Sequence, residues 1–369
     1  MMKRILTVIT VLALGLGAAA QGLLDKGLSA EAKGLDDLAE GYYREATDTS
    51  IAARLRLGLL LERHEHYREA ISWLSQADSG ATAMAHLAAA QSEIREWSAA
   101  KQSAEKAIEL AADDDHEVLA SAQGTLALVY CEQDNLNNAL AWANKATKSD
   151  PQSARAMNVT GIVYFRRNDE NNALRYFRDA MKADPHGTDA YFNLGSVYCY
   201  RNNPDLAIST LRKGLKENRQ SVKLLYCLGW AYMLKDNGEK AIECLNEVLK
   251  LDSGYVNAYN RMGDIYFSRN EYNSAIEQYR KAIGIAPKLS EAYRLLGRTY
   301  AEMGNTGKAI FNYQKAVEIN KNDAETYCRI AELAAKQKQS AKEKSNYRRA
   351  ARLGHKEAQQ WCTKHGVTY

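Results

Sequence analysis

Residues 191 to 215 read YFNLGSVYCYRNNPDLAISTLRKGL and predict two short helices joined by a turn. The first half has apolar or small residues at i, i+3, i+4 and i+7, the spacing of one helix face: Tyr191, Leu194, Gly195 and Tyr198. In the second half, "NNPDLA" supplies an asparagine of the kind that caps helices, and then a proline suited to the first helical position. Further apolar side chains beside the first face need a partner of their own.

The whole unit recurs along the chain at intervals of 34 residues. The small residue of each first helix stands at Ala127, Gly161, Gly195, Gly229, Gly263, Gly297 and Ala331. Three residues later come Tyr130, Tyr164, Tyr198, Tyr232, Tyr266 and Tyr300, and twelve residues later Ala139, Ala173, Ala207, Ala241, Ala275 and Ala309. A fixed period of this length indicates stacked helix pairs, because one pair alone cannot bury its apolar face. The small residues would let two helices approach closely, and the tyrosines would form the core between pairs.

In this register the sequence resembles the tetratricopeptide repeat family. The resemblance covers residues 120 to 323 in six unbroken copies, with four residue classes in register. It implies an all-α fold, a right-handed superhelical solenoid built from antiparallel helix pairs. A degenerate copy and the ending "AARLGHKEAQQWCTKHG" follow, and we expect them to cap the array.

The predicted domain organisation follows from this register. We expect a signal peptide at residues 1–20, an N-terminal cap helix region at 21–50 and two divergent repeats at 51–114. Six regular repeats at 120–323 and a degenerate repeat with a capping helix at 324–369 complete the chain. Extra residues around "DHEVL" between 114 and 120 should lengthen a loop or a helix end.

The first residues, MMKRILTVITVLALGLGAAAQG, have the anatomy of a bacterial secretory signal. Lys3 and Arg4 precede an apolar run, and Ala18 and Ala20 place cleavage before Gln21. The run is shorter than the ~20 residues of a membrane span, so an uncleaved anchor is the less favoured alternative. Since no cysteine precedes Cys131, a lipid-modified cysteine at the cleavage site is excluded. We therefore expect a periplasmic or secreted chain with no transmembrane span after cleavage.

The amino-acid composition makes some classes of binding partner less favoured than others. With 49 Lys and Arg against 45 Asp and Glu, the formal charge of +4 is too small to favour nucleic acid or an anionic membrane. The 46% of apolar residues is ordinary for a folded protein. The six cysteines are scattered singly, which favours structural or unpaired thiols over a disulfide framework.

Motifs for catalysis and metal binding are missing or incomplete. "HEHYREA" at 64–70 lacks the second histidine of a zinc-protease helix, because Arg68 stands at that position. His355, Cys362 and His365 cluster near the C-terminus without an evident fourth zinc ligand. Signal, repeats and caps use nearly the whole chain. The sequence thus predicts no catalytic, metal or cofactor site and no enzyme.

The resemblance implies that the first helix of each pair lines a concave groove where ligands, commonly peptides, bind. The predicted partner groove consists of Arg155, Asn158, Phe165, Arg166, Phe192, Tyr200, Tyr226, Trp230, Met233, Asn257, Asn260, Phe267, Arg294 and Arg298. It has an aromatic middle flanked by amides and arginines, and such a contiguous patch usually marks a binding site. The alternative that Phe165, Phe192 and Phe267 only pack between first helices stays open.

The function predicted is a non-catalytic scaffold that binds a peptide or helix of a protein partner, in bacterial envelope assembly or secretion. One alternative is a saccharide-binding or enzyme-accessory subunit that uses Trp230, Tyr226 and Tyr200 as stacking platforms. Another is a homo-oligomer assembled through the apolar groove.

Overall fold

The computed structural model describes residues 18–77 and 80–369. Its described residues form helices, turns and loops and contain no strand, which confirms the predicted all-α array of helix pairs. Most of the predicted signal peptide, residues 1–17, lies outside this range. Within it, no helix combines the length and the apolar character needed to cross a membrane.

The chain divides into two compact units. The first runs to Val197 and includes Lys213–Ser221, and the second comprises Tyr198–Arg212 and Val222–Tyr369. The helices of the N-terminal part are α2 (Asp36–Ala46), α3 (Ile51–Arg63), α4 (Tyr67–Leu74), α5 (Ala81–Glu93), α6 (Trp97–Leu110), α7 (His116–Glu132), α8 (Leu136–Ser149), α9 (Ala154–Arg166) and α10 (Glu170–Ala183). Before them, residues 18–31 are also helical.

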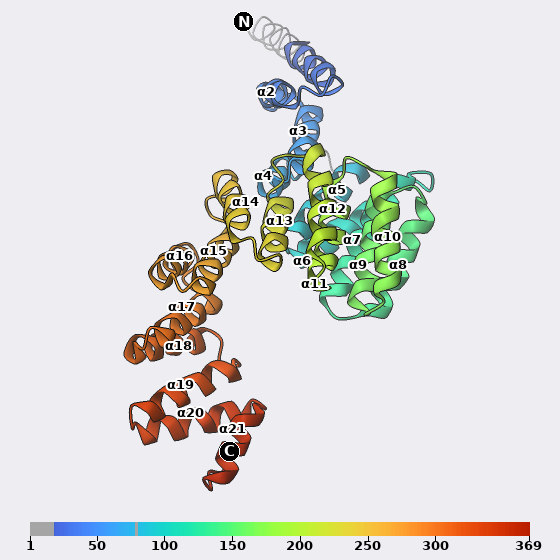
Figure 1. Ribbon diagram of the computed structural model, residues 1–369. Coiled ribbons are helices and arrows are strands. Elements are labelled where there is room, and N and C mark those ends of the chain that lie inside the picture. Colours follow the sequence, from blue (N-terminus) through green and yellow to red (C-terminus); the bar gives the residue numbers. More distant parts are fainter. Residues whose placement is uncertain (1–17, 78–79) are drawn as a thin grey trace, which may run out of the picture. The chain divides into compact units, whose positions relative to one another are not determined.

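The remaining helices continue the same alternation of first and second helices. They are α11 (Thr188–Tyr200), α12 (Pro204–Glu217), α13 (Val222–Leu234), α14 (Gly238–Leu251), α15 (Val256–Ser268), α16 (Tyr272–Ile285), α17 (Ser290–Glu302), α18 (Thr306–Ile319), α19 (Ala324–Lys336), α20 (Ser340–Arg352) and α21 (Lys356–Lys364). In the second unit, α15–α16, α17–α18 and α19–α20 are antiparallel pairs, each packed on the next (Figure 1). The longer α7 accommodates the extra residues around "DHEVL" at its start.

Each pair closes around its small residue. A Cβ placed on Gly161 would lie 2.6 Å from Phe177 Cε1, and one on Gly297 would lie 2.8 Å from Tyr313 Cδ1. The large side chain comes from the second helix, sixteen residues after the small one, and Phe177 is only 1% exposed. Where the small residue is Ala127, the facing side chain is the small Ala143. The glycine is therefore required because the second helix fills the space of its side chain.

The turn inside each pair has one residue in the left-handed region, seven residues after the small one. Its φ lies between 52° and 73° at Glu65, Arg95, Asp134, Asn168, Asn202, Asp236, Asn270, Gly304 and Lys338. Asn, Asp and Gly adopt this conformation most readily and hold six of the nine turns. The second helix then starts at a cap: Asn203 Oδ1 accepts from the Leu206 amide at 3.5 Å, as predicted, and Asn237 Oδ1 accepts from the Lys240 amide at 3.1 Å.

The recurring tyrosines are less uniformly buried than the sequence predicts. Tyr198, Tyr232 and Tyr300 are at most 8% exposed, but Tyr130, Tyr164 and Tyr266 are only half-buried. Tyr232 and Tyr300 accept hydrogen bonds at their hydroxyls from Arg212 at 2.7 Å and Arg280 at 3.0 Å. These arginines belong to the second helix of the preceding pair. The prediction that each of these tyrosines is a core residue is therefore only partly met by the three half-buried ones, of which Tyr130 and Tyr266 pack against core clusters.

Both ends of the chain carry extra helices. Leu24 of the helix at 18–31 and Tyr43 of α2 belong to one core with α3 and α4, and the Tyr43 hydroxyl donates to Glu31 Oε2 at 2.6 Å. The predicted cleavage point before Gln21 lies inside this first helix. At the other end α21 packs on α20, and Trp361 stacks on Tyr347 with ring centroids 4.2 Å apart.

Candidate partner-binding surface

In the first unit, the predicted groove residues lie on first helices but are largely engaged within the protein. Asn158 is 7% exposed, and its Oδ1 accepts from Asn193 Nδ2 at 3.0 Å. Arg166 is exposed and pairs with Glu132 at 3.4 Å. Phe165 and Phe192 are half-buried. These side chains therefore contribute contacts between helices as well as surface.

Arg155 is the exception among them. One of its terminal nitrogens donates to Thr125 Oγ1 at 3.4 Å, which is a long hydrogen bond. Its buried Nε has no hydrogen-bond partner in the described part of the chain. An unpaired buried donor is costly, so this group calls for an acceptor from elsewhere.

In the second unit, aromatic and arginine side chains of consecutive first helices meet at Trp230. The Tyr200 and Trp230 rings pack edge to face with centroids 4.9 Å apart, and Tyr200 is 69% exposed. The Arg261 guanidinium lies 5.3 Å from the centroid of the Trp230 ring, and its Nε donates to the Tyr226 hydroxyl at 3.2 Å. Tyr226 also packs on Tyr255 at 5.2 Å.

A second arginine lies over an aromatic ring on the next pair of helices. The Arg298 guanidinium of α17 lies 3.9 Å from the centroid of the Phe267 ring of α15, a cation–π contact. Neither Arg298 nor Arg261 makes an ion pair with any carboxylate of the described residues. We call Tyr200, Tyr226, Trp230, Arg261, Phe267 and Arg298 the aromatic–arginine surface.

Asp264 is a half-buried carboxylate on α15, the helix that also carries Arg261 and Phe267. It accepts a hydrogen bond from the Tyr279 hydroxyl at 2.8 Å. Burial raises the pKa of Asp264, while the Tyr279 hydrogen bond and the charges of Arg261 and Arg298 act in the opposite direction. The Asp264 carboxylate therefore interacts favourably with the charges of both guanidinium groups without forming an ion pair with either.

The remaining predicted residues of this unit differ in exposure. Asn257 is exposed and Met233 is half-buried. Arg294 donates through its Nε to Glu291 Oε2 at 3.0 Å, so this predicted groove arginine already has a carboxylate partner on its own helix. Asn260 is 7% exposed, and its Oδ1 has no hydrogen-bond partner among the described residues.

A comparison between copies explains the unpaired amide of Asn260. Asn158 stands at the same repeat position, and its Oδ1 is satisfied by Asn193, thirty-five residues later. The residue thirty-five after Asn260 is Leu295, which has no donor to offer. This copy therefore leaves unpaired a buried acceptor that another copy pairs internally.

Sequence reasoning missed Arg261. It stands two residues before Gly263, at a position that was not among those predicted to line the groove. Asn193 occupies the same position relative to Gly195, and both side chains reach the residue thirty-five earlier, Tyr226 or Asn158. The position gave no distinct signal, because polar and apolar residues both occur there in the other copies, among them Thr125, Val159, Asn193, Leu295 and Arg329.

A depression of about 800 Å³ lies elsewhere in this unit. It is lined by Leu225 of α13 and by side chains of the second helix α14, including Glu243, Cys244 and Lys250. None of its lining residues belongs to the predicted groove. It is open to solvent and has mixed charge, so it does not offer the aromatic anchors of the aromatic–arginine surface.

The C-terminal residues considered for zinc do not assemble as a set. None of the six cysteines forms a disulfide, Cys362 is fully buried, and His365 Nδ1 lies 2.8 Å from the Trp361 carbonyl oxygen. Among described residues, the ligand atoms that do come together belong to Cys328, His355 and Glu357. Burial, and then the charges of neighbouring glutamates, raise the pKa of Cys328 to about 12.

Comparison with solved structures agrees with the fold. MamA is 31% identical, covering 45% of this chain and 96% of MamA, with a TM-score of 0.39. The human IFIT1 dimer is 14% identical with a TM-score of 0.58, covering 92% of this chain and 94% of IFIT1. PilW, described as a widely conserved type IV pilus biogenesis factor, is 19% identical with a TM-score of 0.50, covering 54% of this chain and 92% of PilW. No curated protein matches the chain.

Family models match the repeats themselves. Two models described as tetratricopeptide repeat match residues 125–188, 159–222 and 222–255. A third, described as TPR repeat, matches residues 263–304 and 297–338. These matches lie in the part of the chain where the 34-residue period is most regular. The chain belongs to the tetratricopeptide repeat family.

Proposed function

We propose that this chain is a non-catalytic interaction protein that binds a peptide or helix of a protein partner on its aromatic–arginine surface. The observation that carries the proposal is the pair of arginines, Arg261 and Arg298, which lie over aromatic rings without an ion pair. A guanidinium in such a cation–π contact still has N–H groups available for a carboxylate or a carbonyl. Partner recognition uses such aromatic and arginine anchors more than any other residue types.

The neighbouring polar groups favour a peptide. Asn257 is exposed on the same helix as Arg261 and Phe267, and its amide can pair with the backbone of a bound chain. Tyr200 is exposed and Met233 is half-buried, and both can add apolar contact. We therefore expect the partner segment to combine apolar side chains with at least one acidic side chain.

The saccharide alternative is less favoured because Trp230 is already engaged. A sugar-stacking tryptophan presents a free ring face, whereas the Arg261 guanidinium lies over the Trp230 ring and Tyr200 packs against it. Tyr226 is likewise held by Tyr255 and Arg261. These contacts prepare a surface for charged and apolar side chains.

Selection from a displayed peptide library tests the proposal. The selected peptide should lose about tenfold or more in affinity with Trp230→Ala plus Tyr226→Ala, and also with Arg298→Ala. Arg298→Lys should recover only part of the loss, because lysine keeps the charge but not the planar fork. Fluorescence anisotropy with the purified full chain measures each affinity.

The matched control is Lys281→Ala on the second helix α16. Lys281 is an exposed cation paired with Glu277 at 2.8 Å, and its loss should leave peptide affinity unchanged. If no peptide is selected, or if affinity is indifferent to all three surface variants, the proposed function is wrong.

We further propose that the protein works in the envelope of a bacterium, in assembly or secretion. The signal-like sequence at residues 1–20 supports this setting. PilW, a pilus biogenesis factor, has a similar fold, but at 19% identity that likeness concerns the fold alone. N-terminal sequencing of the chain recovered from the periplasm of an expressing bacterium should read from Gln21. Recovery of the intact chain from the cytoplasm would contradict the setting.

A further inference from the structure

Three different metal-ligand types meet where the last repeat joins the terminal helix. Cys328 lies on α19, His355 is the N-cap residue of α21, and Glu357 lies in the first turn of α21. One ligand atom from each lies within 4.8 Å of the other two. Cys328 is buried, His355 is half-buried and Glu357 is exposed, so the cluster reaches from the core to solvent.

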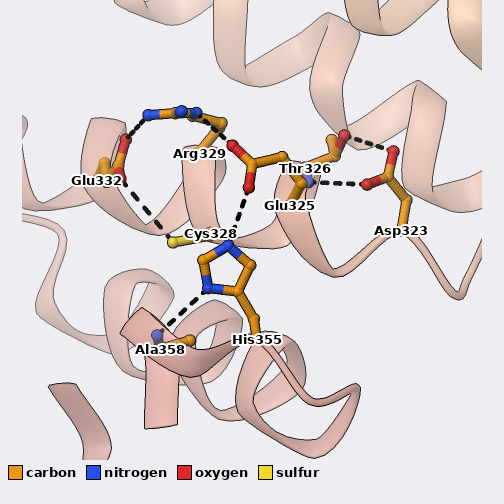
Figure 2. A network of polar contacts seen from close by, with 8 residues as sticks. All are labelled: Asp323, Glu325, Thr326, Cys328, Arg329, Glu332, His355 and Ala358. Atoms are coloured by element: carbon orange, nitrogen blue, oxygen red, sulfur yellow. Dashed lines mark hydrogen bonds and ion pairs between the residues drawn. The ribbon is translucent and has the colours of Figure 1, made fainter. Parts of the chain in front are cut away.

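Further carboxylates surround the cluster (Figure 2). His355 Nε2 lies 2.9 Å from Glu325 Oε2, and Cys328 Sγ donates to Glu332 Oε1 at 3.8 Å. Arg329 bridges the two glutamates, at 2.9 Å from Glu325 and 3.1 Å from Glu332. The figure places His355 below α19, with its ring directed toward Cys328 and Glu325.

The charge of this region favours a cation. Glu325 and Glu332 of α19 and Glu357 of α21 act on the Cys328 thiol with three negative charges, and Arg329 of α19 acts on it with a positive charge. Arg329 already pairs with two of the three carboxylates. The carboxylate of Glu357 has no part in that bridge, so negative charge remains beside the thiol and the imidazole.

We propose that Cys328, His355 and Glu357 bind a divalent transition-metal ion of the zinc class, which ties α21 to α19. Thiolate, imidazole and carboxylate together are ligands that suit zinc, whereas magnesium and calcium prefer oxygen alone. The site shares no residue with the aromatic–arginine surface, so it stands or fails independently of the proposed function.

The geometry needs only small side-chain movements. With a Zn–S distance of about 2.3 Å and Zn–N and Zn–O distances of about 2.0–2.2 Å, tetrahedral ligand atoms lie roughly 3.3–3.7 Å apart. The present spread of up to 4.8 Å must therefore contract by about an ångström. Glu357 is exposed on the first turn of its helix and can move without disturbing the core.

Metal binding would displace the proton of the Cys328 thiol and the hydrogen bond that His355 accepts. The Cys328 thiol would lose its proton to solvent as the sulfur binds the metal. His355 Nδ1 accepts from the Ala358 amide at 3.4 Å. That bond would be given up, because a metal-bound neutral imidazole has no second free lone pair. It is a long bond, and a metal ion bridging α19 and α21 would take over the task of fixing the start of α21.

Cobalt titration of the metal-stripped full chain tests the proposal. A cysteine ligand gives a near-ultraviolet thiolate-to-cobalt charge-transfer band, so the wild type should develop this band and zinc should abolish it by competition. The band should be absent in Cys328→Ser and should need about tenfold or more cobalt in His355→Ala and Glu357→Gln. Zinc should raise the melting temperature of the wild type and not of Cys328→Ser.

The matched control is Cys362→Ser, which alters the other buried cysteine of this region and should keep the band. Should Cys328→Ser fail to fold, as judged by circular dichroism, Glu357→Gln carries the test because it changes only an exposed side chain. Lack of a charge-transfer band in the wild type, a band that survives Cys328→Ser, or equal affinity in Glu357→Gln would each overturn the proposal.

Discussion

At the scale of single residues, the two helices of most pairs fit together because a small residue on the first helix faces a large side chain on the second. An aromatic ring from the facing helix occupies the space beside three of the glycines: Phe177 beside Gly161, Tyr279 beside Gly263 and Tyr313 beside Gly297. In the copy that has Ala127, the facing residue shrinks to Ala143. The last copy departs from this relation, because Ala331 is followed sixteen residues later by the large Tyr347.

Gly263→Ala should destabilise the second unit. The new Cβ would overlap the Tyr279 ring, which is fully buried and held by its hydrogen bond to Asp264. We expect a loss of about 1–3 kcal/mol in the free energy of unfolding, measured by urea denaturation. Gly284→Ala on the adjacent α16 is the control, since its Cβ meets nothing within 4 Å. It should be neutral or stabilising by up to about 1 kcal/mol. Equal effects of the two changes would contradict this packing.

Asp264 should make stability depend on pH. Burial raises its folded pKa above the ~3.9 of an unfolded chain, so the folded state binds more protons in the interval between the two values. Its contribution to stability is complete below the unfolded pKa and is lost as pH rises through the folded pKa. Asp264→Asn should therefore gain in stability relative to wild type between pH 3 and pH 7. A constant difference across this range, measured by denaturant titration, would show that the carboxylate does not titrate in this way.

At the scale of elements, the turn within each pair is set by one left-handed residue. Asn, Asp or Gly occupies it in the regular copies, but the end copies use Glu65, Arg95 and Lys338. A side chain with a Cβ costs energy in this conformation. The end repeats therefore hold their turns with less suitable residues than the middle ones.

Lys338→Gly should stabilise the last repeat, because glycine adopts the φ of 59° without steric cost. We expect a gain of about 1 kcal/mol in the free energy of unfolding. Gly304→Ala, at the same position one copy earlier with a φ of 73°, should lose a similar amount. Opposite signs for the two changes, measured by thermal or urea unfolding, are the expected result. If Lys338→Gly destabilises the protein, the turn is not the source of strain.

Much of each element could be predicted from the sequence, because helix faces, caps and small residues are local signals. The positions of Ala139, Ala241 and Asn203 were predicted in this way, and the structure has them in the expected roles. The partners of the small residues were not predicted, since Phe177, Leu245 and Tyr279 share a position but not a residue type. Arg261 was missed for the same reason: its role depends on a side chain thirty-five residues earlier.

At the scale of the whole molecule, function depends on what the repeats do not share. Residues that recur every 34 positions form the contacts between helices, while Tyr226 and Trp230 each occur at their repeat position in one copy. The predicted groove residues differ in exposure and in hydrogen bonding. Some are exposed, some pair with other residues of the chain, and Asn260 is buried with an unpaired acceptor. The domain boundaries and the groove as a continuous site stay predictions, because side-chain chemistry alone does not say which exposed residues a partner covers.

The most direct test of the central claim is hydroxyl-radical footprinting of the full chain with and without the selected peptide. Oxidation of Tyr200, Trp230 and Phe267 should fall several-fold when peptide is bound. Phe311, a 58% exposed aromatic on the second helix α18, should be oxidised equally in both samples. Protection of Phe311 while Tyr200 and Trp230 stay fully reactive would contradict the assignment of the aromatic–arginine surface as the binding site.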